Sequence, residues 1–253
     1  MDKETRLREY CRRLRLPAIA QNYQELALQA QSYHLSHEEY LLNLLERESS
    51  HQDESQVRRL INATGFPLKK TLDSFDFAEN PNLNQSKVLT LSRGQYIKDK
   101  ENVILAGNSG TGKTHLAISL GICACQSKYK VGFYTAAGLV NILTEMEGEK
   151  QLLKFQRQLL RKDLVIIDEL GYIPFSRRSA ELLFQFFSNR YEKGSTIITT
   201  NLEFSEWNQV FGDEKMTAAL LDRVTHNAHI LITNGESFRL KQTIQKQKQP
   251  QPV

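Results

Sequence analysis

The sequence predicts an α/β fold with a parallel sheet flanked by helices, preceded by a small all-helical N-terminal domain. Between about residues 103 and 240, short apolar runs alternate with segments of helical periodicity, the pattern of a parallel sheet covered on both faces. A glycine-rich loop lies between the first apolar run and a helical segment. Upstream, residues 2–62 contain no glycine and carry apolar residues at helical spacing.

The chain is expected to divide into four regions. They are a helical N-terminal domain over 1–62, a connector over 63–95, the α/β domain over 96–241 and a disordered tail over 242–253. Within the first region, Ser36 is followed three residues later by Glu39, the capping arrangement that begins a helix. Glycines and prolines interrupt the connector, and the tail is rich in Gln, Lys and Pro.

The elements of the α/β domain follow from the periodicity of its apolar residues. Strands are expected at 103–106, 131–135, 164–167, 196–200, 230–233 and 238–240. Helices are expected at 113–126, 139–146, 152–160, 180–191, near Glu206 and at 216–224.

Composition excludes several classes of protein. Hydrophobic residues make up 40% and charged residues 25%, which argues against disorder of the whole chain. No apolar run is long enough to span a membrane and no signal peptide is recognised, so we expect a cytoplasmic protein without a membrane partner. The cysteines Cys11, Cys123 and Cys125 lack zinc-site spacing and are expected to be reduced.

A phosphate-binding loop is the most specific motif. It fits G-x-x-x-x-G-K-[ST] and consists of Gly107, Asn108, Ser109, Gly110, Thr111, Gly112, Lys113 and Thr114. Its glycines let backbone N–H groups turn toward phosphates at a helix N-terminus, Lys113 reaches the β and γ phosphates, and the Thr114 hydroxyl binds Mg²⁺. The motif therefore predicts ATP and Mg²⁺ as ligands.

Two adjacent carboxylates end an apolar strand, and they favour a hydrolase over a kinase. Asp168 lies where ligands of open α/β sheets collect and is expected to hold Mg²⁺ through water. Side chains alternate along a strand, so Glu169 is expected to point toward the attacking water as the candidate base. The alternative is that both are solvated residues at a strand end.

Three further residues are candidates for contacts with the triphosphate. Asn201 follows a buried strand and is expected to orient the water or to contact the γ-phosphate, the alternative being a turn residue. Arg223 is a candidate finger for a neighbouring subunit's γ-phosphate, unless it pairs with Asp222 or Glu214. Arg239 is a candidate for touching nucleotide within its own subunit.

Basic residues gather in three places, and each group can neutralise DNA phosphates without reading sequence. The candidates are Arg12 and Arg13 beside Arg6, Arg8 and Arg15, then Arg58, Arg59, Lys69 and Lys70, and finally Arg177 and Arg178. Arg177 and Arg178 are expected in a loop beside the Asp168 strand, where nucleotide could influence DNA binding. The alternative for each group is a solvated helix face.

These residues together resemble the IstB-like helper ATPases of bacterial insertion sequences, within the AAA+ class and close to the DnaC helicase loaders. The most specific blocks are 168–172, 195–201, 204–207, 210–213 and 221–223. The resemblance implies Walker A at 107–114, Walker B at Asp168 with catalytic Glu169, sensor I at Asn201, an arginine finger at Arg223 and sensor II at Arg239. It also implies a homo-oligomer that assembles on duplex DNA with ATP at subunit interfaces and recruits a partner transposase.

Other functions share part of this pattern. A replicative-helicase loader of the DnaC type uses the same machinery on single strands. A P-loop kinase would need an acceptor site, which the sequence does not show, and a nucleotide-gated DNA scaffold would not depend on hydrolysis. The leading interpretation is a DNA-bound ATPase that assists transposition.

Overall fold

The structure is a computed structural model that describes residues 2–235 and 237. It divides into two compact units, Met1–Arg59 and Leu60–Val253. The predicted strand at 238–240, Arg239 and the tail at 242–253 lie outside the described residues.

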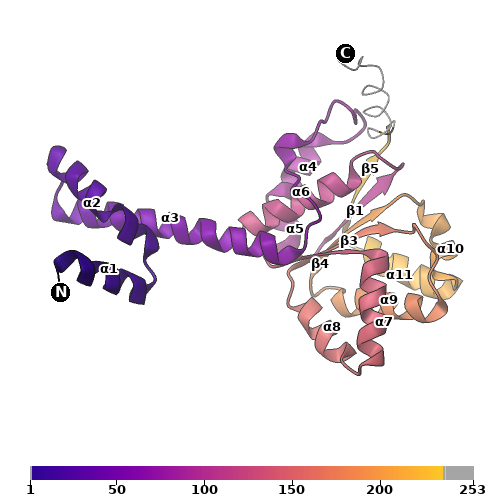
Figure 1. The fold of residues 1–253 in the computed structure, drawn as a ribbon. Coiled ribbons are helices and arrows are strands. Elements are labelled where there is room, and N and C mark those ends of the chain that lie inside the picture. Colours follow the sequence, from indigo (N-terminus) through magenta and orange to yellow (C-terminus); the bar gives the residue numbers. More distant parts are fainter. Residues whose placement is uncertain (1, 236, 238–253) are drawn as a thin grey trace, which may run out of the picture. The chain divides into compact units, whose positions relative to one another are not determined.

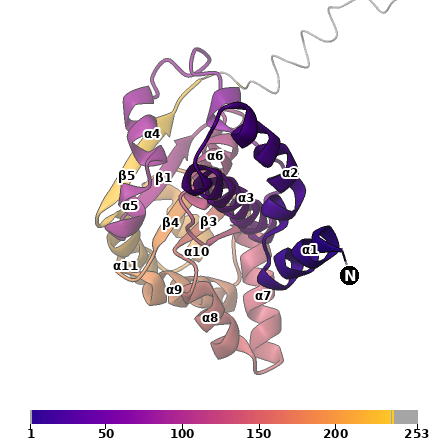
Figure 2. The same ribbon diagram turned by 90° about the vertical axis from the view of Figure 1, so that its left-hand side faces the viewer.

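The described residues of the first unit form helices joined by short turns. It contains α1 (Lys3–Leu14), α2 (Pro17–Ser32) and most of α3 (His37–Thr64), whose last residues belong to the second unit. Figures 1 and 2 show α1 and α2 beside the first part of α3. The Tyr40 hydroxyl donates to the Tyr23 carbonyl oxygen at 3.0 Å and joins α3 to α2.

The start of α3 confirms the predicted capping arrangement. The Glu39 amide donates to Ser36 Oγ at 3.2 Å, and the Ser36 amide donates to Glu39 Oε2 at 2.7 Å. These hydrogen bonds lower the pKa of Glu39, because they favour its charged form. Two amides that a helix start leaves without intrahelical partners are thereby satisfied.

Among the described residues, a five-stranded sheet forms the centre of the second unit (Figure 1). Its strands are β1 (Asn102–Gly107), β2 (Val131–Thr135), β3 (Leu164–Leu170), β4 (Ser195–Thr200) and β5 (Ala228–Thr233). The strand order is β2-β3-β4-β1-β5 and every pairing is parallel. The carboxyl ends of all five strands therefore meet at one edge of the sheet, with β4 between β1 and β3.

Helices cover both faces of this sheet, as the alternating pattern predicted. They are α4 (Gln85–Ser92), α5 (Gln95–Lys98), α6 (Lys113–Gln126), α7 (Ala136–Gly148), α8 (Leu152–Leu160), α9 (Arg177–Arg190), α10 (Trp207–Phe211) and α11 (Glu214–Thr225). Two short 3₁₀ helices lie at Leu72–Ser74 and Phe204–Glu206.

Each face of the sheet has its own hydrophobic core. Along β3, Leu164 and Ile166 pack with α4, α5 and α6, whereas Val165 and Ile167 pack with α7 to α11. All four side chains are fully buried, because successive residues of a strand point to opposite faces. The apolar run that predicted this strand is thus explained by helices on both sides.

The predicted connector contributes to the first of these cores. Val88 and Leu91 of α4 and Leu83 are buried there together with Phe75. The segment between α3 and β1 therefore packs onto the sheet and its helices and does not merely link two parts of the chain.

One expected loop is helical. Helix α9 begins at Arg177, three residues before the predicted start, because Ser176 Oγ accepts a hydrogen bond from the Ser179 amide at 3.2 Å. A serine at this position satisfies an amide of the first turn and allows the helix to begin early. The expectation that Arg177 and Arg178 lie in a loop is wrong for this reason.

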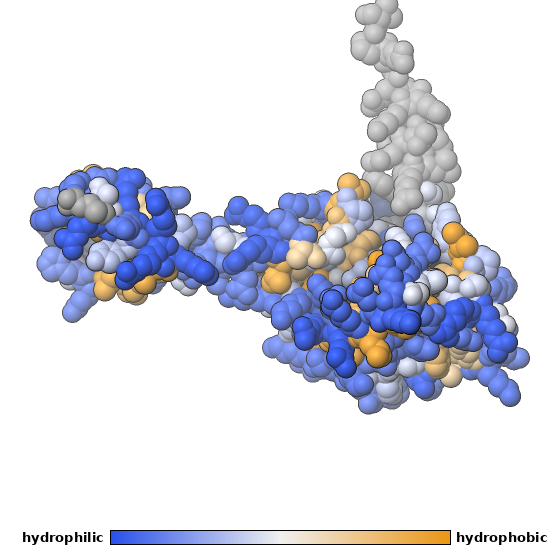
Figure 3. Space-filling view, turned by 60° about the horizontal axis from the view of Figure 1, so that its bottom comes forward, coloured by the Kyte–Doolittle hydropathy of each residue, from blue (hydrophilic) through white to orange (hydrophobic). Residues whose placement is uncertain are grey.

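The surface of the described residues is mostly polar. Figure 3 shows a mostly hydrophilic face with hydrophobic residues in separate small areas. Among the described residues, no helix is long and apolar enough to cross a membrane. Cys11, Cys123 and Cys125 are free thiols, and burial raises the pKa of Cys123 and Cys125.

Candidate functional site

The glycine-rich loop joins the end of β1 to the start of α6, at the carboxyl edge of the sheet. Gly112 precedes α6 with φ +90°, and a Cβ there would lie 2.7 Å from the Phe75 ring. A Cβ on Gly107 would lie 2.0 Å from the Thr233 carbonyl oxygen at the end of β5. These close approaches explain why the loop needs glycine at both positions.

Hydrogen bonds within the loop fix its shape. Lys113 Nζ donates to the carbonyl oxygens of Gly107 and Asn108, each at 2.7 Å. Thr111 Oγ1 donates to the Asn108 carbonyl oxygen at 2.8 Å and lies 2.8 Å from Thr233 Oγ1. The ammonium of Lys113 is therefore held at the loop, at the N-terminus of a 14-residue helix.

The structure brings the two predicted metal ligands together. Thr114 Oγ1 lies 3.0 Å from Asp168 Oδ1, although 54 residues separate them. Asp168 is only 4% exposed, and its Oδ1 also accepts a hydrogen bond from Thr199 Oγ1 at 2.5 Å. A hydroxyl and a carboxylate at one point are hard oxygen ligands, so this pair fits Mg²⁺.

Glu169 reaches the same site through a β-bulge. The register between β3 and β4 shifts between Ile167 and Leu170, and Glu169 has φ +61°, which is rare for a residue other than glycine. The Glu169 amide donates to Thr199 Oγ1 at 2.9 Å. Simple alternation along the strand, on which the prediction rested, is interrupted at this position.

Thr114 and Glu169 line one cleft of about 420 Å³, whereas Asp168 is not among its lining residues. It contains the loop from Ser109 to Thr114 together with Glu169 and Asn201. Asn201 is exposed and directly follows β4, the strand between the phosphate loop and Asp168. The predicted phosphate loop, the candidate base and the candidate sensor thus line the same cleft.

The sequence patterns do not point to three further residues of the cleft. Phe75, Glu79 and Asn80 also line it. Asn80 is 6% exposed, and its Oδ1 has no hydrogen-bond partner among the described residues. Ser237 also approaches the loop, since a Cβ on Gly110 would lie 2.2 Å from its Oγ. No motif marks Glu79 or Asn80.

Arg223 lies at the other edge of the sheet. It lines a small depression with Asn102, Thr196 and Asn227, which stand at the amino ends of β1, β4 and β5. A six-residue strand such as β1 spans roughly 20 Å, more than an arginine side chain can bridge. Arg223 Nη1 donates to Ser188 Oγ at 3.0 Å. Among the described residues, it forms no ion pair with Asp222 or Glu214, the two alternatives considered from the sequence.

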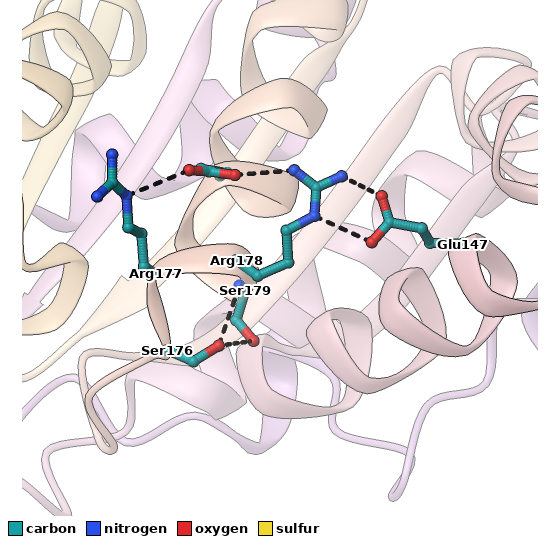
Figure 4. A network of polar contacts seen from close by, with 6 residues as sticks. Glu147, Ser176, Arg177, Arg178 and Ser179 are labelled. Carbon is teal, nitrogen blue, oxygen red and sulfur yellow. Dashed lines mark hydrogen bonds and ion pairs between the residues drawn. The ribbon is translucent and has the colours of Figure 1, made fainter.

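The arginines at the start of α9 differ in how their charge is used (Figure 4). Arg178 donates to Glu147 of α7 through Nε at 3.0 Å and through Nη2, and to Glu181 at 2.8 Å. This pairing lowers the pKa of Glu147. Arg177 has an ion pair with Glu181 at 3.5 Å and its side chain is 91% exposed. Arg178 is therefore largely neutralised, whereas Arg177 faces solvent.

The other predicted DNA contacts are exposed. Arg12 and Arg13 lie in the last turn of α1, and Arg58 and Arg59 lie on α3. Lys69 and Lys70 follow α3 in the second unit, where Lys70 lines the cleft. Nothing in these contacts tests DNA binding, which stays a prediction.

Comparison with known proteins identifies the family. Residues 10–246 match the family of IstB-like ATP binding proteins. A protein of Geobacillus stearothermophilus, named as an ATP-binding protein of insertion sequence IS5376, is 38% identical over 96% of this chain and 98% of its own length. One from Pseudomonas aeruginosa, named for insertion sequence IS21, is 35% identical over 91% of this chain and 87% of its own. The chain belongs to the IstB-like ATP binding protein family.

Solved structures agree with this IstB-like assignment at the level of fold. DnaA of Aquifex aeolicus bound to AMPPCP matches with a TM-score of 0.56 and 20% identity, over 73% of this chain and 56% of that one. DnaI matches with a TM-score of 0.54 and 13% identity, over 71% of this chain and 92% of that one. The second unit of this IstB-like protein thus has the AAA+ P-loop fold, as predicted.

Proposed function

We propose that this IstB-like protein is a Mg²⁺-dependent ATPase that assembles on duplex DNA as a homo-oligomer and assists a partner transposase. The observation that carries the proposal is that Lys113, Thr114 and Glu169 line one cleft, where Thr114 is hydrogen-bonded to Asp168. Family membership and the names of the relatives support the link to ATP and to insertion sequences.

The phosphates of ATP bind at the loop. Backbone amides and the α6 N-terminus face the α and β phosphates, and Lys113 exchanges its contacts with Gly107 and Asn108 for the β and γ phosphates. Thr114, and Asp168 through water, would hold Mg²⁺, which would supply positive charge beside the phosphates. The buried hydrogen bond from Thr199 keeps the Asp168 carboxylate in one orientation.

Hydrolysis needs a base at the far side of the γ-phosphate. The Glu169 carboxylate takes a proton from water as the water oxygen attacks phosphorus, and the bond to the β–γ bridging oxygen breaks to release ADP and phosphate. The Asn201 amide orients the water without adding charge. Both residues line the cleft together with the phosphate loop.

The base of the nucleotide binds at the wall formed by Phe75 and Asn80. The Phe75 ring already packs against Gly112, and Asn80 Oδ1 is a buried acceptor without a partner among the described residues. A buried acceptor of this kind is stabilised by an N–H donor, which adenine supplies through its exocyclic amine.

Arg223 completes the site of a neighbouring subunit. Its position at the amino edge of the sheet, across from the phosphate loop of the same chain, supports action between subunits. Charge on the γ-phosphate in the transition state is stabilised by such an arginine. Oligomerisation on DNA would then control turnover.

Glu169→Gln tests the proposed chemistry. The variant should bind ATP with Mg²⁺ and accumulate on duplex DNA, while its phosphate release falls roughly 10²- to 10⁴-fold, because an amide cannot accept the proton. Lys113→Ala should lose ATP binding itself. Turnover and equilibrium binding would be measured separately for each variant.

Glu145→Gln is a matched control, since this glutamate is exposed on α7 outside the cleft. It should behave as the unsubstituted protein. Rapid turnover by Glu169→Gln would remove Glu169 from the role of base.

The partner is tested by co-purification on duplex DNA with ATP. A transposase encoded by the same insertion sequence should be retained by the Glu169→Gln assembly and not by Lys113→Ala. Retention of a replicative helicase instead would replace this proposal by a loader function.

A further inference from the structure

The surroundings of the Arg223 guanidinium are unusually specific for a surface arginine. Its carbon lies 4.8 Å from the centroid of the Phe184 ring, and Nη1 donates to Ser188 Oγ at 3.0 Å. Both partners belong to α9, whereas Arg223 belongs to the last turn of α11. Because Phe184 and Ser188 are four residues apart in a helix, they present a common face to the guanidinium.

These two contacts restrict different movements of the side chain. The negative face of the Phe184 ring attracts the cation and holds the guanidinium over the ring. The Ser188 hydroxyl fixes its rotation there. A guanidinium has five N–H donors, and this hydrogen bond uses one of them. The group is half-buried and oriented, yet keeps donors for another ligand.

The helix that supplies both contacts is itself fixed at both ends. At its start, Arg178 joins Glu147 of α7. At its end, the buried Arg190 donates to the carbonyl oxygens of Leu159 at 2.8 Å and Ser195 at 2.7 Å. Helix α9 is therefore a rigid support for a side chain that carries much rotamer freedom in isolation.

We propose that Phe184 and Ser188 are positioning residues that hold Arg223 ready for the nucleotide of a neighbouring subunit. The inference rests on the trans role of Arg223 proposed above and adds the residues that make this role efficient. An arginine side chain that is already oriented loses less conformational freedom when it binds the neighbour's γ-phosphate. Its orientation should therefore increase the turnover rate more than the affinity for ATP.

Mixed oligomers provide the test. Glu169→Gln keeps Arg223 but lacks the base, and Arg223→Ala keeps the base but lacks the finger. Each alone should be nearly inactive, and mixing them should restore turnover where an Arg223→Ala site meets the Arg223 of a Glu169→Gln subunit. Ser188→Ala is then introduced into only one of the two mixed variants at a time.

We expect Ser188→Ala to lower the restored turnover roughly tenfold when it lies in the Glu169→Gln subunit, because misplacement of a catalytic group has effects of this size. In the Arg223→Ala subunit it should change little. Ser188→Thr, which keeps a hydroxyl, should recover the activity. Phe184→Leu, which keeps apolar bulk but removes the ring, should follow the same subunit dependence.

Thr225→Ala is the matched control, since this hydroxyl lies on the helix of Arg223 but donates to the Leu221 carbonyl oxygen. It should change little in either subunit. Equal losses from Ser188→Ala in both subunits, or no loss in either, would overturn the positioning role and leave the trans finger intact. Failure of the mixture to restore any turnover would overturn the trans finger and the positioning role together.

Discussion

At the scale of single residues, Thr199 joins the two acidic groups of the site. Its buried hydroxyl donates to Asp168 Oδ1 and accepts from the Glu169 amide, at 2.5 and 2.9 Å. The bulge explains how Thr199 can contact both residues, since Asp168 and Glu169 together lie opposite this single position of β4. Thr199 thereby links the carboxylate of the proposed magnesium ligand to the backbone of the candidate base.

Replacing Thr199 tests this coupling. Thr199→Val keeps the shape but leaves the Glu169 amide without this partner and leaves Asp168 Oδ1 with only its hydrogen bond from Thr114, so stability should fall by about 1–3 kcal/mol. Turnover should fall as well, because the Asp168 carboxylate and the Glu169 backbone each lose a hydrogen bond that fixes their position. Thr199→Ser should retain both properties. Denaturant unfolding and phosphate release measure the two effects, and a fully active Thr199→Val would show that the hydroxyl has no part in the site.

At the scale of elements, α9 connects the predicted DNA surface with the support of Arg223. It is capped by Ser176, tied to α7 through Arg178 and anchored at its end by Arg190. Burial lowers the pKa of Arg190 to about 10, so this arginine remains charged at neutral pH. Its guanidinium satisfies carbonyl oxygens at the amino edge of the sheet.

The start of α9 gives a prediction about DNA. Arg177→Ala should weaken duplex binding and lower the magnitude of the slope of log affinity against log salt by about 1, because an exposed cation releases counterions when it meets a phosphate. Arg178→Ala should affect DNA binding less, since Glu147 and Glu181 already neutralise Arg178. Binding isotherms at several salt concentrations measure both. Equal effects of the two substitutions would contradict the assignment.

At the scale of the whole molecule, the nucleotide site lies entirely within the unit Leu60–Val253. Its walls come from the segment before β1, from the phosphate loop and from the ends of β3 and β4. A ligand that binds these segments together stabilises the folded state against the unfolded chain.

ATP with Mg²⁺ should therefore raise the melting temperature of the protein. At a concentration one hundred times the dissociation constant, the expected stabilisation is about 2.7 kcal/mol. Lys113→Ala should show no shift, and chelation of Mg²⁺ should reduce the shift of the unsubstituted protein. Thermal unfolding with and without nucleotide measures this, and an unchanged melting temperature in the presence of Mg²⁺ and ATP would contradict the proposed ligand.

The sequence alone determined the parts of this protein that depend on neighbours along the chain. The phosphate loop, the buried strand that ends at Asp168 and the helix that begins after Ser36 each follow from local spacing, because backbone geometry repeats every two residues in a strand and every 3.6 in a helix. The motif also fixed which residue types could hold phosphate and Mg²⁺.

Only the tertiary structure decided which distant residues meet. The strand order puts Thr199 between the phosphate loop and Asp168, and the bulge brings Glu169 to the same cleft. Glu147 neutralises Arg178 from another helix, and Ser188 orients Arg223 from 35 residues away. These contacts depend on how the strands and helices pack. The periodicity of the sequence shows which face of a helix or strand is apolar, but it does not show which other element packs against that face.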